Sequence, residues 1–246
     1  MRYLSEAQRL KSNSEFSKRF SIVYDVPLSF PNEFNNFDGL QKLLVVNALQ
    51  TGITLTKSYE IAGIHPEQGI RAKNKLVADG MAREHSIVTK GSGGHCTILE
   101  LLPPAIEILK KMNISPVEMK GRGSFLHRFY TNKYLAEWAK SKEYKYWIER
   151  WLEPKCIDFV YEDEYQRLNA IEVSLSGDAL MILESGKKCA SLKGIHEVTL
   201  AFNKRDLMKL VKELLKKELM SVQEKIFLKY LNEYWIDDER KKETTG

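Results

Sequence analysis

The sequence predicts a mixed α+β or α/β protein that is built from two modules. Its 246 residues exceed the ~100–150 residues of a usual domain, so two domains are expected. Helical patterns dominate the first half of the chain, whereas the second half carries three consecutive β-runs before helical patterns return. Apolar residues make up 43% and charged residues 29% of the chain, which is ordinary for a globular protein.

The segment 37–112 is predicted to fold as one helical module that includes a β-hairpin. Apolar periodicity and helix-start residues predict helices at 39–49, 54–62, 66–79 and 103–112, and β-runs at 82–89 and 96–101. Pro66 stands at the first position of the third helix, where proline is favoured. The glycine-rich connection at 90–94 is typical of a hairpin between two short strands.

Three helices followed by a β-hairpin resemble the winged helix-turn-helix domain of many DNA-binding regulators. The resemblance implies that the third helix, Pro66–Asp79, enters the major groove and that Lys90–His95 forms the wing. It also implies contacts to phosphates and base edges from exposed polar and basic residues, namely Gln68, Arg71, Lys73, Asn74, Lys75 and Lys90. Winged helices also dock on proteins, so a protein-docking module is the alternative.

Two acidic residues interrupt neighbouring apolar β-runs in the second half of the chain. Asp158 lies in the run 156–161 and Glu172 in the run 168–175, and the polar stretch 162–167 between them suits a hairpin turn. A carboxylate among Ile, Phe and Val costs several kcal/mol to bury unpaired. Two such acids close together would repel unless a cation joined them, and Mg²⁺ prefers oxygen ligands. Alternatively, each acid faces solvent or pairs with a nearby lysine.

The elements around these acids follow the order α-β-β-β-α-β-α. Their predicted bounds are a helix at 123–142, strands at 146–152, 156–161 and 168–175, a helix at 178–192, a strand at 197–202 and a helix at 204–219. This order resembles the core of the PD-(D/E)XK nuclease superfamily, which includes restriction endonucleases. The resemblance implies that Asp158 and Glu172 bind Mg²⁺ or Mn²⁺, and that the bound ion activates a water against a phosphodiester.

The chain departs from the family pattern at Ser174, because Glu172-Val173-Ser174 stands where the family has Glu-x-Lys. A serine hydroxyl cannot supply the positive charge that the lysine places near the water or the phosphate. Either another lysine fills that space, with Lys187 and Lys188 on the following helix the nearest candidates, or the domain is degenerate. The predicted function is Mg-dependent DNA cleavage in DNA processing, mobile elements or defence. The alternative is a DNA-binding regulator or assembly factor that does not cleave.

The start of the first core helix carries further candidate residues. Ser124 is a predicted N-cap, and the open backbone N–H groups at a helix start suit a phosphate. His127 lies in the first turn, near the place where the family often has an extra acid, so it is either a ligand or catalytic residue or a structural one. Two acids compete for that place, namely Glu137 and Glu149. Arg122 and Arg128 are expected to hold the DNA backbone.

Domain boundaries follow from these patterns. They are an N-terminal arm at 1–36, the winged helix at 37–112, a linker at 113–123, the nuclease-like domain at 124–220, and a C-terminal helix with a disordered tail at 221–246. An apolar stripe predicts that the C-terminal helix spans 221–235, and its terminal position allows a homodimer contact. The three cysteines are too far apart for a disulfide framework, so reduced thiols are expected.

The net charge and the absence of certain sequence motifs restrict the expected binding partners and the expected cell compartment. A net charge of +5 is compatible with nucleic acid, and double-stranded or branched DNA is the expected partner. No P-loop motif appears, so an ATPase or a recombination protein would be a separate partner. No apolar run approaches the ~20 residues that span a bilayer, and the N-terminus lacks the apolar core of a secretory signal. We therefore expect a cytoplasmic protein with no membrane contact.

Overall fold

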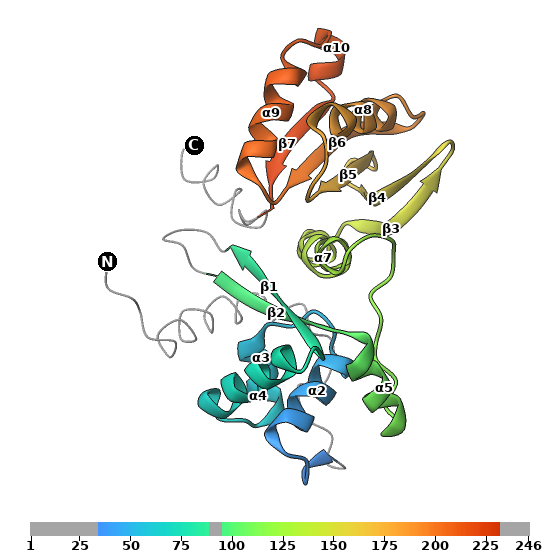
Figure 1. Cartoon of the computed structure of the whole chain (residues 1–246). Helices are drawn as coiled ribbons and strands as arrows, with labels where there is room; N and C mark the ends of the chain where they lie inside the picture. The colour runs from blue at the N-terminus through green and yellow to red at the C-terminus, as the bar shows by residue number, and fades with distance from the viewer. Residues whose placement is uncertain (1–33, 89–94, 232–246) are drawn as a thin grey trace, which may run out of the picture. The chain divides into compact units, whose positions relative to one another are not determined.

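The computed structural model describes residues 34–88 and 95–231 (Figure 1). The chain divides into two compact units, and the division in the sequence falls between Met119 and Lys120. Helices and strands occur in both units, which confirms the predicted mixed α/β class. Within the described residues, no helix has the length and apolar character that a bilayer-spanning segment needs.

The described part of the N-terminal unit consists of helices and one antiparallel hairpin. Its elements are α2 (Gly39–Leu49), α3 (Leu55–Ala62), α4 (Pro66–Ala78), β1 (Ala82–Val88), β2 (His95–Leu101) and α5 (Pro103–Lys111). Each element lies within a few residues of its predicted bounds. Residues 1–33 and 89–94, which include most of the predicted arm and Lys90 of the predicted wing, lie outside the described residues.

Local capping explains where the first two helices begin and end. The Asp38 carboxylate accepts a hydrogen bond from the Gln41 backbone, and the Gln41 side chain accepts one from the Asp38 backbone. This reciprocal capping box satisfies two backbone N–H groups at the start of α2. The Thr54 side chain caps α3 by accepting from the Lys57 backbone, and Gly63 ends the helix in a left-handed conformation that glycine adopts without strain.

Helix α2 lies at the centre of the N-terminal unit. Leu43 and Leu44 are fully buried, together with residues from every other element of the unit. Helix α4 approaches α3 closely at Gly69, where a Cβ atom would lie 2.5 Å from the ring of Tyr59. Ile114 also packs into this core, so the first residues of the predicted linker belong to the N-terminal unit.

The C-terminal unit is a five-stranded mixed sheet with helices on both faces (Figure 1). Its helices are α6 (Phe125–Phe129), the π-helix η3 (Tyr130–Leu135), α7 (Ala136–Ser141), α8 (Ala179–Ala190), α9 (Arg205–Leu215) and α10 (Met220–Gln223). Its strands are β3 (Lys145–Leu152), β4 (Lys155–Glu162), β5 (Leu168–Ser174), β6 (Ile195–Phe202) and β7 (Ile226–Tyr230). They lie side by side in chain order, and β3, β4 and β5 are antiparallel, whereas β6 and β7 continue the sheet in parallel.

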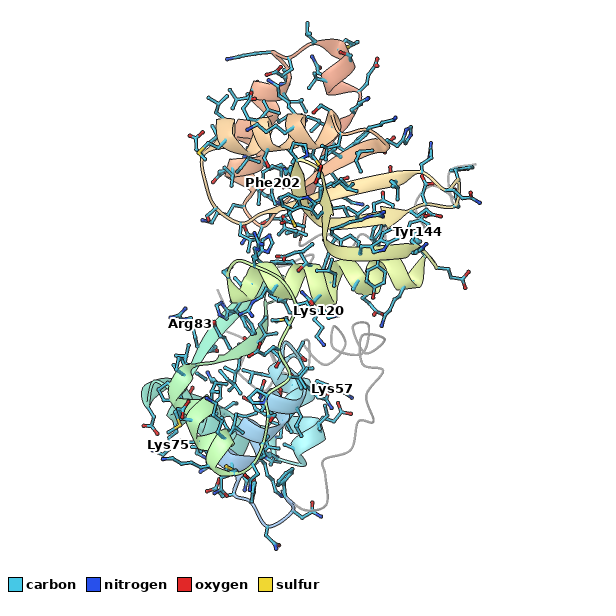
Figure 2. All side chains as sticks on the ribbon, turned by 90° about the vertical axis from the view of Figure 1, so that its right-hand side faces the viewer. Lys57, Lys75, Arg83, Lys120, Tyr144 and Phe202 are labelled. Atoms are coloured by element: carbon cyan, nitrogen blue, oxygen red, sulfur yellow. The ribbon has the colours of Figure 1, made fainter. Side chains whose placement is uncertain are left out.

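Each face of the sheet has its own helical cover. Helices α8 and α9 pack over one face, where Val160, Ala170 and Val198 are buried in a common core with them. Phe202, labelled in Figure 2, is a fully buried member of the same core. On the other face, the ring of Trp138 in α7 meets the ring of Tyr161 edge-on at 4.9 Å.

The prediction of a C-terminal helix is wrong over its described part. The structure has only the short helix α10 and then strand β7, which pairs with β6 in parallel register from Val198 opposite Ile226. Apolar residues in this segment stand both four apart and two apart, so the pattern suits a helix or a strand. The open edge of β6 offers backbone hydrogen-bond partners, and these decide for a strand. The expected homodimer contact depends on that helix, and 232–246 lie outside the described residues.

Candidate functional site

Three acidic residues lie in a row across β3, β4 and β5. Phe159 pairs with Ile171, so the next pair in the same antiparallel register places Asp158 opposite Glu172. On its other side, the pairing of β4 with β3 is interrupted at Glu149, which has a left-handed φ of 49°. Directly opposite residues in antiparallel strands have Cβ atoms ~4.5–5.5 Å apart. The negative charge of Asp158 also acts on Glu172, so the two carboxylates lie near each other.

The in–out alternation of β4 breaks at Asp158. Ile157 and Val160 are both buried in the core beneath α8, although residues three apart on a regular strand face opposite ways. The break lies opposite Glu149, where the β3 backbone is also irregular. Local irregularities of this kind re-aim side chains and are common next to active sites. The Asp158 side chain can therefore contact His127 of α6 and also lie near Glu172.

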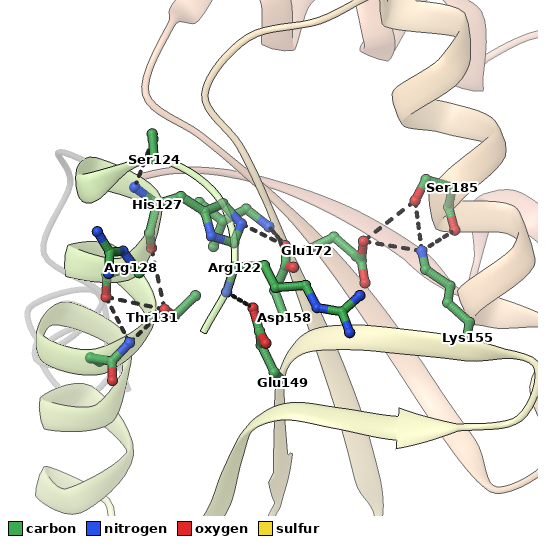
Figure 3. A network of polar contacts seen from close by, with 12 residues as sticks. Arg122, Ser124, His127, Arg128, Thr131, Glu149, Lys155, Asp158, Glu172 and Ser185 are labelled. Carbon is green, nitrogen blue, oxygen red and sulfur yellow. Dashed lines mark hydrogen bonds and ion pairs between the residues drawn. The ribbon is translucent and has the colours of Figure 1, made fainter. Parts of the chain in front are cut away.

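Each of the two central acids has a basic partner (Figure 3). The His127 Nε2 atom lies 3.1 Å from Asp158 Oδ2, which also accepts a hydrogen bond from the Val173 backbone at 2.8 Å. The Lys155 Nζ atom lies 3.0 Å from Glu172 Oε2. Lys155 also donates to the hydroxyl of Ser185 on α8 at 2.6 Å and to its carbonyl at 3.0 Å. Basic and acidic side chains thus lie next to one another from α6 across the sheet to α8.

The helix start on the α6 side brings His127 and Arg122 to the acids. The Ser124 hydroxyl caps α6 by accepting a hydrogen bond from the His127 backbone at 3.3 Å. The backbone N–H of Arg122 donates to a Glu149 carboxylate oxygen, and Arg122 itself is exposed. The helix then widens into η3, whose Thr131 donates to the carbonyl of His127. Single turns of π-helix are frequent at functional sites.

Burial and charge shift the protonation equilibria at this site. Burial, and secondly the negative charge of Asp158, raise the pKa of Glu172 to about 7, although Lys155 acts in the opposite direction. The hydrogen bond to Asp158 raises the pKa of His127 above its ordinary value. Two carboxylates that face each other in a poorly solvated place favour either a proton or a cation between them.

The residues present fit a hard divalent cation in part. Oxygen Oε1 of Glu172 is buried and has no hydrogen-bond partner among the described residues. Two carboxylates are a donor set that Mg²⁺ accepts, since this ion keeps several waters and takes one or two protein carboxylates together with substrate phosphates. Within 34–88 and 95–231, no group of three or more His, Cys, Asp and Glu side chains has the arrangement of a metal site. Asp158 and Glu172 would therefore hold the ion, with water and phosphate as its remaining ligands.

The lysine at the acids is not one of those expected. Lys187 pairs instead with Glu184 at 2.8 Å and Glu218 at 3.1 Å. Lys188 is exposed on α8, and no ion pair joins it to either acid in the described part of the chain. Lys155 occupies the place beside Glu172. On a regular strand, positions 155 and 158 would face opposite ways, so only the break in β4 brings Lys155 to the site.

The other predicted site residues divide into exposed and buried ones. Gln68, Arg71, Asn74 and Lys75 lie on α4 away from its fully buried positions, and Figure 2 shows Lys75 on the surface of the N-terminal unit. The expectation that Lys73 is exposed is wrong: its side chain is buried on the face of α4 that carries Ala72 and Leu76, and pairs with Glu84 of β1 at 3.1 Å. In the C-terminal unit, Ser174 and Arg128 are partly exposed, and the Nε atom of Arg128 is buried.

No protein-family model matches the chain, and comparisons with curated proteins and with solved structures find no match.

The raised pKa of Glu172 predicts how stability changes with pH in the absence of divalent cations. Its ordinary pKa is 4.5 and its pKa in the folded protein is about 7, so the folded state holds this proton more tightly than the unfolded state. The resulting stabilisation is complete below pH 4.5 and is lost as the pH rises through about 7. The complete loss corresponds to about 3 kcal/mol, of which roughly 2 kcal/mol falls between pH 5.5 and pH 8.

Urea unfolding in EDTA at pH 5.5 and pH 8 measures this loss. Wild type should be less stable at the higher pH, and Glu172→Gln should show a smaller difference because the amide does not titrate. The other titrating groups, His127 included, are common to both proteins and cancel in the comparison. Equal losses in the two proteins would contradict the shift.

Proposed function

We propose that this protein is a divalent-cation-dependent nuclease that acts on DNA. The C-terminal unit is assigned as a nuclease domain of the PD-(D/E)XK type and the N-terminal unit as a winged-helix DNA-binding domain. The single observation that carries the proposal is the pair Asp158 and Glu172, which face each other on adjacent strands with a lysine at hydrogen-bond distance. The sheet supports it, because β3, β4 and β5 are followed by the α8 crossover and the parallel strand β6, in the order that the family resemblance implies.

The residues of the site have complementary roles in this proposal. An Mg²⁺ or Mn²⁺ ion held there would lower the pKa of a bound water and offset charge on the phosphate. Asp158 and Glu172 would hold the ion through their carboxylate oxygens, and Oε1 of Glu172 has no hydrogen-bond partner among the described residues. His127 fixes the orientation of Asp158 by its hydrogen bond. When no cation is bound, protonated His127 offsets the negative charge of Asp158.

Lys155 supplies the positive charge that Ser174 cannot. Its ammonium group is anchored by two hydrogen bonds to Ser185 and therefore stays at the site when Glu172 turns to a cation. A fixed ammonium in a partly buried place stabilises a developing phosphate charge more strongly than one in water. The side chain of Lys155 is 18% exposed, so it is shielded but still accessible to a phosphate.

The exposed face of α4 supports DNA binding by the N-terminal unit. Arg71, Lys75, Gln68 and Asn74 project from the side opposite to the one that packs on the core. Guanidinium and ammonium groups contact phosphates, and the amide side chains reach base edges. Lys75 forms an ion pair with Asp79 at 2.9 Å, but its side chain is 65% exposed, so a phosphate can replace this carboxylate at small cost.

Removing two of these charges should weaken duplex binding. Arg71→Ala combined with Lys75→Ala should lower affinity for duplex DNA by about tenfold and reduce the salt slope by ~2, since two phosphate contacts are lost. Fluorescence anisotropy at several salt concentrations measures both effects. The matched control is Lys110→Ala combined with Lys111→Ala, which removes two exposed charges from α5 of the same unit. Equal effects of the two double variants would mean that α4 is not the DNA-binding face.

The nuclease activity is tested on a panel of labelled duplex, branched and single-stranded DNAs. With Mg²⁺ or Mn²⁺, the purified protein should cut at least one of them, and EDTA should stop the reaction. A second candidate function is favoured by Ser174: a DNA-binding regulator or assembly factor whose nuclease fold no longer cleaves. A protein that binds DNA but cuts no member of the panel with either ion would decide for this second function.

A further inference from the structure

Trp151 is an exposed aromatic side chain on the edge strand of the sheet. Strand β3 is the first in the sheet order, and Trp151 is 59% exposed near its end. The other tryptophan of β3 is covered: Arg150 lies 4.0 Å and Lys145 lies 5.1 Å from the centre of the Trp147 ring. In the described part of the chain, no ring contact or cation–π contact involves Trp151. Its ring is therefore open to a ligand.

This open ring lies beside the acids. Trp151 follows Glu149 by two residues on β3, which corresponds to roughly 7 Å along the strand. Across the strands it pairs with Cys156, two residues before Asp158. Arg122 lies at the same acids, because its backbone N–H donates to the Glu149 carboxylate (Figure 3).

We propose that Trp151 and Arg122 bind an unpaired strand of nucleic acid next to the acids. An exposed indole offers a stacking surface for a base, and bases within a duplex do not offer their faces to a side chain. The guanidinium of Arg122, a residue that contacts Glu149, suits the phosphate of the same strand. The inference rests on the proposed nuclease function and deepens it, because it names the substrate class: DNA with a single-stranded segment or an unpaired end.

Charge favours a nucleic-acid strand over a second copy of this chain. The chain as a whole has a net charge of +5, and Arg122 beside the acids is exposed. Two copies of this chain repel each other through their net charge, whereas a polyanion is attracted to either copy.

The proposal is tested by measuring the binding of a labelled oligo(dT) in EDTA, where cleavage cannot interfere. The oligonucleotide has about fifteen nucleotides, roughly the upper end of the site size of a single-strand-binding fold. Anisotropy should show saturable binding of oligo(dT) to the protein, and tryptophan fluorescence should be quenched. Trp151→Ala should weaken oligo(dT) binding by about tenfold, the loss of one stacked base. Trp151→Phe should keep affinity within about threefold, because a phenyl ring still stacks.

Three controls distinguish base stacking from charge attraction and from a loss of folding. Tyr165→Ala removes another exposed aromatic ring, which Arg167 covers at 4.7 Å, and should leave affinity unchanged. Inorganic polyphosphate should bind wild type and Trp151→Ala equally, since it has no bases to stack. Urea unfolding should show that Trp151→Ala retains the stability of wild type; if it does not, Trp151→Phe and quenching of the wild type decide.

Several outcomes would overturn the proposal. The first is an oligo(dT) affinity that is the same in wild type and Trp151→Ala. The second is a loss of polyphosphate binding in Trp151→Ala that equals its loss of oligo(dT) binding. The third is a change of oligomeric state in Trp151→Ala, which would mark the edge as a contact between copies. Failure of the nuclease function alone gives a different pattern: no DNA is cut, yet oligo(dT) binding still depends on Trp151. Glu162→Gln should bind oligo(dT) as wild type does, because Glu162 pairs with Leu168 at the other end of β4.

Discussion

Replacing Asp158 by asparagine, or Glu172 by glutamine, should lower the rate of cation-dependent DNA cleavage by on the order of 10³-fold. Each change removes one of two carboxylates proposed to hold the ion, and several kcal/mol of transition-state stabilisation are lost with it. The amide side chains keep the size and the hydrogen-bond acceptor of the acids, so the fold should persist. Single-turnover cleavage of the preferred substrate measures the effect, and anisotropy should show unchanged DNA affinity.

Glu162→Gln is the matched control for this experiment. Glu162 lies on the same strand as Asp158 but pairs with Leu168 at the far end of β4. Its replacement removes one negative charge from the strand and should leave the rate unchanged. A preparation in which Asp158→Asn cuts as fast as wild type would show that another group, or a contaminating enzyme, does the chemistry.

Replacing Lys155 by methionine should lower the cleavage rate by about 10²–10³-fold, the range seen when one fixed charge-stabilising donor is removed. Methionine keeps the length and apolar contacts of the lysine stem, so the change isolates the ammonium group. Cation binding should persist, since both carboxylates remain. Ser174→Lys in the same protein should restore part of the rate, because Ser174 follows Glu172 by two residues on β5 and stands at the family's lysine position.

Lys188→Met serves as the control for the lysine assignment. Lys188 is a sequence candidate for the same role, but it is exposed on α8 and should be dispensable for cleavage. A rate that falls with Lys188→Met and stays within about twofold of wild type with Lys155→Met would reverse the assignment.

Most elements of the fold could be predicted because their signals are local. The alternation of apolar residues in β4 and β5 and the caps of α2 and α3 depend on residues close in sequence, and the predicted bounds agree with the structure within a few residues. Strand β7 could not be separated from a helix, because its apolar spacing suits both. Its strand conformation comes from the edge of β6, which is distant in sequence.

The candidate site could be predicted in part for a similar reason. Asp158 and Glu172 could be found because charged residues inside apolar β-runs are conspicuous. Lys155 could not, since its contact with Glu172 depends on the break in β4 opposite Glu149, which no period-two pattern can indicate. The burial of Lys73 could not be predicted either, because helix periodicity alone does not decide whether its long side chain reaches Glu84.

Calorimetric titration of Mn²⁺ into the metal-free protein at pH 8 tests the central claim most directly. We expect saturable binding of one ion to wild type and to Glu162→Gln, and loss of that binding when Asp158→Asn and Glu172→Gln are combined. Wild type that binds no ion, or a double variant that binds it as tightly as wild type, would contradict the assignment of these two carboxylates as a cation site.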